Sequence, residues 1–214
     1  MRVQVVCVCV GGLVGCHAGT GQSPDGGMPE GDGPAAQGLH VDWISKPDLP
    51  GPIGNNVTID SVTLQVQNLR AIADAGPTDS SSATVTWDSG TMPGPTELET
   101  APTGLYSKLS LDLDGDLLDN SYEIKGSVMI SGQPHAFEIH DRDISKITMD
   151  CNLTLAPDGG LTLPIRIDFA GALGVIDFST LDTEGSMLEL DTDDAQMPAF
   201  RAQLVKSFKL EDGD

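Results

Sequence analysis

A short acidic segment carries the residues whose types and spacing best suit metal chemistry. Asp112, Asp114 and Asp116 alternate around Gly115, and Asp119 follows closely. Ca²⁺ binds six to eight oxygen ligands, and closely spaced carboxylates in a tight loop supply such ligands. The segment therefore predicts a calcium site at Asp112, Asp114, Asp116 and Asp119, and Ca²⁺ is the one cofactor that the sequence suggests. The alternative is a solvated acidic turn, because Asp and Gly are ordinary turn residues.

This segment departs from the EF-hand pattern of calcium loops. Glu123 falls at the twelfth position, where an EF-hand has its bidentate ligand, but Leu117 occupies the position of the required glycine. The flanking residues alternate as strands do. We therefore expect a calcium loop of another kind, placed between two strands.

The other polar residues give weaker signals for chemistry. His135 and His140 are five positions apart, so on one strand their side chains point to opposite faces, which disfavours joint ligation of a transition metal. An acidic stretch near the C-terminus can supply two carboxylates for glycoside hydrolysis, or can form a solvated, self-repelling face. Its members are Asp177, Asp182, Glu184, Glu189, Asp191, Asp193 and Asp194. The sequence contains no GxSxG, HExxH, Walker or Rossmann fingerprint, so we expect a protein that is not an enzyme.

The charge of the chain narrows the range of partners. There are 11 Lys and Arg residues against 32 Asp and Glu residues, which gives a formal net charge of −21. Such a surface repels phosphate backbones and anionic lipid headgroups. We therefore expect no binding to nucleic acid, and any membrane attachment must come from acyl chains.

The first residues follow the pattern of a secretory signal. Arg2 precedes an apolar run at residues 3–14, and small residues lie just before Cys16. The run is shorter than the roughly 20 apolar residues that span a bilayer. Because the run is rich in Val, the alternative is a buried N-terminal β-strand.

Leu13-Val14-Gly15-Cys16 resembles the lipobox of bacterial lipoproteins. The resemblance implies that residues 1–15 are a signal peptide and that Cys16 carries a diacylglycerol and usually a third acyl chain, such as palmitate. Two or more acyl chains anchor a protein stably to a bilayer. His17 stands where an aspartate retains enteric lipoproteins in the inner membrane. The resemblance therefore implies an extracytoplasmic protein of the periplasm or cell envelope, anchored by lipid to the outer membrane, and it leaves open which leaflet holds the anchor.

The residues after the lipobox are predicted to form a lipidated, disordered tether over residues 16–38. Residues 17–38 hold seven Gly and three Pro and almost nothing that could be buried. Such a segment cannot offset the entropy lost on ordering. The remaining residues, 39–214, are then expected to form one domain.

From residue 39 onward, apolar and polar residues alternate in many short runs. The clearest runs cover residues 147–155 and 161–169. Strict alternation indicates half-buried strands, and short strands separated by Gly, Pro, Asp and Asn turns are typical of an antiparallel sandwich. Asp158-Gly159-Gly160 lies between the two runs and predicts a hairpin turn. The sequence thus predicts a mainly β fold, an antiparallel β-sandwich.

One C-terminal segment has helical spacing instead. Asp193 or Asp194 can cap its start, and Pro198 is tolerated in a first turn. We predict a short C-terminal helix, with an edge strand over residues 207–210 as the alternative. The apolar residues at helical spacing are Met197, Phe200, Leu204, Val205 and Phe208.

Two other residue types bear on binding. Cys151 alternates with apolar residues and is expected to be a buried free thiol that reacts slowly. Exposed aromatic rings can stack on sugars, but Trp43 and Trp87 fall on apolar faces, so both are expected in the core. Tyr106 and Tyr122 are not assigned by the pattern.

Gly104-Leu105-Tyr106, which enters a predicted strand, resembles a feature of uncharacterised extracytoplasmic lipoproteins with prealbumin-like sandwich domains. The resemblance covers residues 57–181 and implies a fold and a location, with an Ig-like sandwich as the alternative. The expected function is that of a membrane-anchored, non-enzymatic envelope lipoprotein whose sandwich binds an envelope protein or a glycan, or serves a structural role. The alternatives are a calcium- or carbohydrate-binding module on the same scaffold and a glycoside hydrolase.

Overall fold

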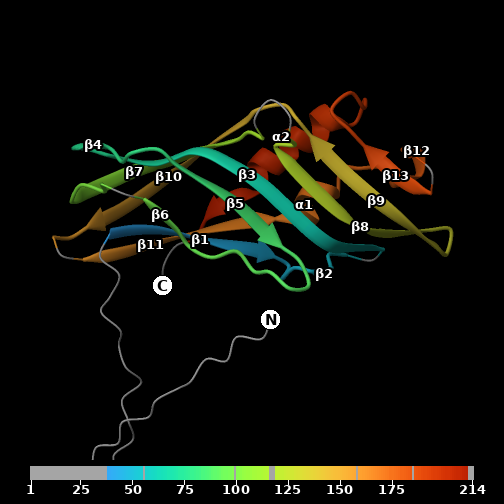
Figure 1. The fold of residues 1–214 in the computed structure, drawn as a ribbon, viewed down its shortest axis with the longest axis horizontal. Coiled ribbons are helices and arrows are strands. Elements are labelled where there is room, and N and C mark those ends of the chain that lie inside the picture. The colour runs from blue at the N-terminus through green and yellow to red at the C-terminus, as the bar shows by residue number, and fades with distance from the viewer. Residues whose placement is uncertain are drawn as a thin grey trace, which may run out of the picture. The chain divides into compact units, whose positions relative to one another are not determined.

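β-strands account for most of the chain (Figure 1), as the alternation predicts. The computed structural model describes residues 38–54, 56–98, 100–115, 119–157, 159–184 and 186–211. The helices are α1 (Phe169–Leu173), the 3-10 turn η1 (Phe178–Thr180) and α2 (Met197–Ser207). The strands are β1 (Gly38–Lys46), β2 (Gly51–Pro52), β3 (Val57–Ala73), β4 (Gly76–Pro77), β5 (Ser81–Trp87), β6 (Thr96–Leu98), β7 (Gly104–Leu113), β8 (Tyr122–Ile130), β9 (Gln133–Asp141), β10 (Ser145–Leu155), β11 (Gly160–Asp168), β12 (Asp182–Glu184), β13 (Met187–Leu190) and β14 (Phe208–Leu210).

The strands form two sheets. The smaller sheet has the order β14-β11-β1-β6, and the larger follows the path β10-β7-β3-β8-β9-β13-β12, with β2, β4 and β5 also paired to β3. Two pairings are parallel, β1 with β11 and β9 with β13. The expectation of a purely antiparallel sandwich is therefore wrong at these two places. Alternation along a strand reports its buried face, but it carries no information on the direction of a distant neighbour.

The long strand β3 organises the larger sheet and crosses its middle in Figure 1. Along one edge it pairs first with β8 and then with β7, and along its other edge it pairs with β5. The change from β8 to β7 occurs at Gln65, whose N–H donates to Ser121 O at 3.0 Å and whose carbonyl accepts from Asp114 N–H at 3.0 Å. The segment that carries the predicted calcium ligands thus leaves and rejoins the sheet beside one residue of β3.

The core lies between the sheets and the C-terminal helices. Trp43 and Trp87 are both buried in it, which confirms their assignment to the core. Trp87 packs edge-on against Phe169 of α1 with ring centroids 5.8 Å apart. Tyr106 and Tyr122 are fully buried as well. All four rings with polar atoms are therefore unavailable as platforms for a sugar.

The connection between β10 and β11 does not close a hairpin, contrary to prediction. It leads from β10 of the larger sheet to β11 of the smaller sheet, and the two strands do not pair. A two-residue hairpin instead joins β8 and β9 through Ser131 and Gly132, whose φ values are +51° and +80°. Positive φ at both central positions is the geometry of a type I′ turn, which matches the twist of the flanking strands.

The C-terminal prediction of a helix is confirmed, and the alternative strand follows it directly. Helix α2 ends at Ser207, and β14 then pairs antiparallel with β11. The predicted capping is wrong, because Gln196 is the N-cap and makes no side-chain capping bond. Asp194 instead accepts the N–H of Gln196 at 2.6 Å, in the turn before the helix. In the part of the chain that the structure describes, no helix is long and apolar enough to cross a membrane.

Candidate functional site

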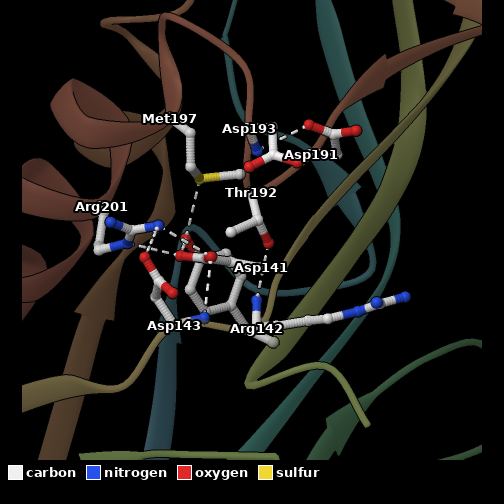
Figure 2. Close-up of polar contacts among 9 residues, drawn as sticks. Asp141, Arg142, Asp143, Asp191, Thr192, Asp193, Met197 and Arg201 are labelled. Carbon is white, nitrogen blue, oxygen red and sulfur yellow. Dashed lines mark hydrogen bonds and ion pairs between the residues drawn. The ribbon is translucent and has the colours of Figure 1, made fainter. Parts of the chain in front are cut away.

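A buried carboxylate joins the C-terminal helix to the larger sheet. Asp141 ends β9 and its side chain is 0% exposed. Arg201 of α2 donates to it twice, from Nε to Oδ2 at 2.6 Å and from Nη2 to Oδ1 at 2.9 Å. Tyr122, the first residue of β8, donates its hydroxyl proton to Oδ2 at 2.8 Å. Figure 2 shows Arg201 reaching from the helix toward Asp141 and Asp143.

Residues 142 and 143, which follow β9, add further contacts to this junction. The N–H of Asp143 donates to Asp141 Oδ1 at 3.1 Å, and Asp143 Oδ2 lies 2.9 Å from Arg201 Nη2. The N–H of Arg142 donates to Thr192 Oγ1 at 3.0 Å, which ties the segment after β13 to the end of β9 (Figure 2). The ion pairs of Arg201 and the Arg142–Thr192 bond thus hold α2 and the segment after β13 against the end of β9.

The electrostatics of the junction favour a permanent ion pair. Burial alone would raise the pKa of the Asp141 carboxyl, but hydrogen bonds from Arg201, the Asp143 N–H and Tyr122 outweigh it, so that the pKa is lowered. Burial, together with the Asp141 charge, raises the pKa of the Tyr122 hydroxyl. The hydrogen bond to Asp141 raises the pKa of Arg201. A general acid in a glycosidase needs the opposite, a carboxyl with a raised pKa, so the Asp141 carboxyl does not suit that role, and its contacts hold α2 against the larger sheet.

Five of the seven residues of the acidic stretch line one hollow. Asp182, Glu189, Asp191, Asp193 and Asp194 line a depression of about 290 Å³. Asp191 and Asp194 accept backbone N–H groups of Asp193 and Gln196, which is the usual role of Asp in turns. Asp177 accepts the N–H of Ser179 at the start of η1. These bonds favour the interpretation of the stretch as a turn-rich acidic surface.

Two of the predicted calcium ligands, Asp112 and Asp119, line different hollows. Asp112 accepts a hydrogen bond from Asn68 Nδ2 at 2.9 Å and lines one hollow together with Arg70 and Lys146. Asp119 lines another hollow with Glu123. The N–H of Asp114 donates to Gln65 O, at the point where β3 changes its partner from β8 to β7. Asp116 lies outside the described residues. Calcium binding by this segment therefore stays a prediction.

The histidines are a second place to look for a metal site. Over the described residues, no group of three or more His, Cys, Asp or Glu side chains is arranged to hold a metal ion. His140 lies between two carboxylates, with Nδ1 3.8 Å from Glu138 Oε1 and Nε2 3.7 Å from Glu189 Oε1. The two ring nitrogens face different carboxylates, so these groups cannot converge on one ion.

Two gaps separate the edges of the sheets. The larger gap, which we name the β10–β14 groove, has a volume of about 630 Å³ and is lined by residues 148–153 and 208–211. The smaller gap, the β5–β6 groove, has a volume of about 470 Å³ and is lined by residues 79–83 and 95–97. A hydrogen bond from Ser81 Oγ to Glu97 O at 3.1 Å bridges the β5–β6 groove. In the described part of the chain, no hydrogen bond joins β10 to β14.

Cys151 lies in the β10–β14 groove and is half-buried, not fully buried as predicted. It shares the inner face of β10 with Met149 and Leu155, as its alternation indicates. Its Sγ donates to Tyr106 O at 3.5 Å. Burial, and to a smaller extent the nearby Asp150 charge, raises the pKa of the thiol. The groove therefore exposes a thiol whose reactivity at neutral pH is low.

The position of Arg201 in the sequence is a signal for a buried ion pair. Arg201 lies four residues after Met197 and three before Leu204, so it falls on the apolar stripe of α2. A charged side chain at such a position requires a buried partner. The identity of that partner, on β9, has no local signature.

Cys16, the predicted lipidation site, lies outside the described residues, as do the predicted signal peptide and all but the last residue of the tether. Strand β1 begins at Gly38, one residue before the predicted start of the domain. Comparisons with protein-family models, with curated proteins and with solved structures each found no match.

Proposed function

We propose that this protein is a lipid-anchored, non-enzymatic envelope protein whose β domain binds a partner. The observation that carries the proposal is Leu13-Val14-Gly15-Cys16 behind a positively charged start and an apolar run. In this proposal Cys16 is acylated and inserts in the outer membrane, residues 17–38 form the tether, and the β domain is extracytoplasmic. The negative surface fits this arrangement, because it gives the domain no attraction of its own to anionic lipid.

The partner-binding role rests on the β10–β14 groove. Its volume of about 630 Å³ falls within the range typical of ligand pockets, roughly 300–1,000 Å³. The charged side chains around Asp141 are paired with one another and hold α2 to the sheet. The lowered pKa of the Asp141 carboxyl does not suit an acid catalyst. Binding is therefore favoured over hydrolysis as the role of the domain.

We assign the sheets to the prealbumin-like sandwiches on the basis of the Gly104-Leu105-Tyr106 entry to β7. Tyr106 is buried, and its hydroxyl donates to Pro102 O at 2.6 Å, which fixes the path of the chain into β7. This fixed entry gives the Gly-x-Tyr feature a structural role. The assignment concerns the fold and carries no activity with it.

Lipid labelling tests the anchor. The full chain and two variants are expressed in a bacterium that is fed radiolabelled palmitate. We expect Cys16→Ser to lose the label and to accumulate in an unprocessed or soluble form, because no other residue of the motif can accept the lipid. Cys9→Ser is the matched control and should label normally, since Cys9 lies in the part that the signal peptidase removes. Label that persists in Cys16→Ser would refute the proposal.

A further inference from the structure

We propose that Asn152 of β10 is a site of N-linked glycosylation by an oligosaccharyltransferase of the bacterial type. This class of enzyme transfers an oligosaccharide from a polyprenyl pyrophosphate to an asparagine side chain. The bond from the amide nitrogen to sugar carbon C1 forms, the bond from C1 to the pyrophosphate oxygen breaks, and the amide loses one proton. Because the reaction takes place on the extracytoplasmic side of a membrane, the inference rests on the location given in the proposed function.

The sequence contains two candidate acceptors. Asn-x-Ser/Thr, with any residue except proline in the middle, is the acceptor motif for N-linked glycans, and two of the five asparagines have it, Asn56 and Asn152. Bacterial enzymes of this class also require an acidic residue two positions before the asparagine. Asp150 occupies that position for Asn152, whereas Gly54 occupies it for Asn56. The full bacterial motif is therefore met at residues 150–154 alone.

The structure presents the recognised side chains of this motif to solvent. Asp150, Asn152 and Thr154 are all exposed, and they alternate with more buried residues along β10. Over the described residues, none of these three side chains makes a hydrogen bond or an ion pair. The acid, the amide and the hydroxyl are thus free to be bound by an enzyme, and an attached glycan would extend into solvent.

The backbone at Asn152 is less constrained than in a central strand. The pairing of β10 with β7 shifts register between Asp150 and Leu153, which leaves Cys151 and Asn152 outside the regular ladder. β10 also ends the path of the larger sheet, so in the described part of the fold β7 is its one hydrogen-bonded neighbour. An acceptor asparagine must turn away from its strand to enter an active site, and a bulge in an edge strand lowers the cost of that movement.

The motif at Asn56 is placed differently. Asn56 is exposed, but Thr58 is half-buried in β3. Thr58 pairs with Pro52 of β2 on one side and with Ser127 of β8 on the other. This motif lacks the acid and is fixed within a sheet, so Asn56 serves as an internal control for Asn152.

A glycan on Asn152 would change what reaches this part of the surface. Asn152 is one of the residues that line the β10–β14 groove, so the glycan would stand at its rim and restrict the entry of large partners. It would also cover the edge of β10 that pairs with no strand in the described fold. N-linked glycans are bulky and solubilising, and a covered edge is protected against pairing with another sheet.

Glycan transfer in vitro tests the inference on the folded full chain, purified in detergent. The chain is incubated with a bacterial oligosaccharyltransferase and a polyprenyl-pyrophosphate oligosaccharide, and the intact mass is measured. We expect one glycan per chain, which is lost in Asn152→Gln and in Thr154→Ala and kept in the matched control Asn56→Gln. Asp150→Asn should slow transfer at least about tenfold, because it removes one charged contact with the enzyme.

Two further measurements separate recognition from presentation. A eukaryotic oligosaccharyltransferase, which does not require the acid, should glycosylate Asp150→Asn as fast as the wild type. A synthetic peptide of residues 148–156 carries the motif without the fold and reports on sequence recognition alone. The glycosylated chain should melt within about 2 °C of the unmodified chain, as expected for a change at an exposed position.

No gain in mass, a gain that survives Asn152→Gln, or transfer by the bacterial enzyme that is equally fast in Asp150→Asn would overturn the inference. Transfer to the peptide but not to the folded chain would overturn it as well, because β10 would then not present the acceptor. The purified reaction needs neither export nor an acyl anchor, so its failure and a failure of palmitate labelling at Cys16 would be told apart.

Discussion

Arg201 of α2 and Asp141 of β9 are 60 positions apart in the chain, and they form a two-pronged ion pair around a carboxylate that is inaccessible to water. The pair joins the last helix to the larger sheet, and α2 leads directly into β14 of the smaller sheet. It therefore fixes one wall of the β10–β14 groove relative to the other. Its loss should affect both the stability of the fold and the geometry of the groove.

Arg201→Met should destabilise the protein strongly. The variant leaves the Asp141 carboxylate buried with no cation, and removing one partner of a buried pair costs about 3–5 kcal/mol. Urea unfolding, followed by circular dichroism, measures the free energy of unfolding. Asp143→Asn is the matched control, because Asp143 also contacts Arg201 but its side chain is 59% exposed. It should cost less than about 1 kcal/mol, and similar losses in the two variants would contradict the central role of Asp141.

The stability of the protein should fall as the pH is lowered through the pKa of Asp141. The pKa of Asp141 is lowered in the folded state, so between that value and the ordinary value of about 3.9 the unfolded chain binds the extra proton. The stabilising effect of the charged carboxylate is fully present above about pH 4 and is lost below it. Unfolding free energies measured below pH 4 should therefore fall more steeply in the wild type than in the double variant Asp141→Leu, Arg201→Met. Parallel curves would show that other groups govern acid unfolding.

Gly126→Ala should be poorly tolerated. A Cβ at this buried position of β8 would overlap Thr58 O of β3 and would lie 2.8 Å from Phe137 Cζ of β9. Overpacking of this kind typically costs about 1–3 kcal/mol, and here backbone must also move. Gly94→Ala is the control, since a Cβ there meets nothing within 4 Å, and it should change stability by less than about 0.5 kcal/mol. Thermal melts of both variants decide the point, and an unaffected Gly126→Ala would show that β3 and β9 can separate at low cost.

Calcium should stabilise the protein more than magnesium if residues 112–119 bind it. At a hundredfold excess over Kd the gain is about 2.7 kcal/mol, which raises the melting temperature by roughly 5–10 °C at about 2–4 °C per kcal/mol. Magnesium should do less, because it demands stricter geometry and gives up its waters reluctantly. The comparison is made at equal ionic strength in the wild type and in Asp114→Ala. Asp150→Ala, which removes the same charge outside the segment, should keep the calcium shift, and its loss in both variants would indicate general screening.

The sequence was sufficient to place individual strands but not to arrange them. Alternation located the buried faces of β10 and β11 and the spacing of apolar residues located α2, because both signals are local. The same alternation suggested a hairpin through Asp158-Gly159-Gly160, whereas the chain there crosses between the sheets. Turn-forming residues predict that the chain changes direction. Which sheet the next strand joins depends on packing between residues far apart in the sequence. The parallel pairing of β1 with β11 depends on residues more than a hundred positions apart and has no local signature.

The candidate site was predicted only in part. Alternation predicted which face of β10 carries Cys151. The groove that leaves Cys151 partly exposed forms between the edges of two sheets, and the sequence of one strand gives no information about such a gap. The buried role of Tyr122 depends on Asp141 and Arg201, which come from other elements. The acidic segment at residues 112–119 drew attention through composition, yet the structure places Asp112 beside Arg70 and Lys146, two cations from other strands.

The position of β11 between β1 and β14 has a consequence for rearranging the chain. Gly38 pairs with Gly160 at one end of β11, and the N–H of Glu211 donates to Pro164 O a few residues along it on the other side. Two strand spacings and this offset separate Gly38 from Glu211 by roughly 15 Å. A short linker could therefore join them, and the chain could be reopened at the exposed Ser131–Gly132 turn as a circular permutant. In such a permutant, any group attached at the new N-terminus would hold the domain by the β8–β9 hairpin and no longer by the start of β1.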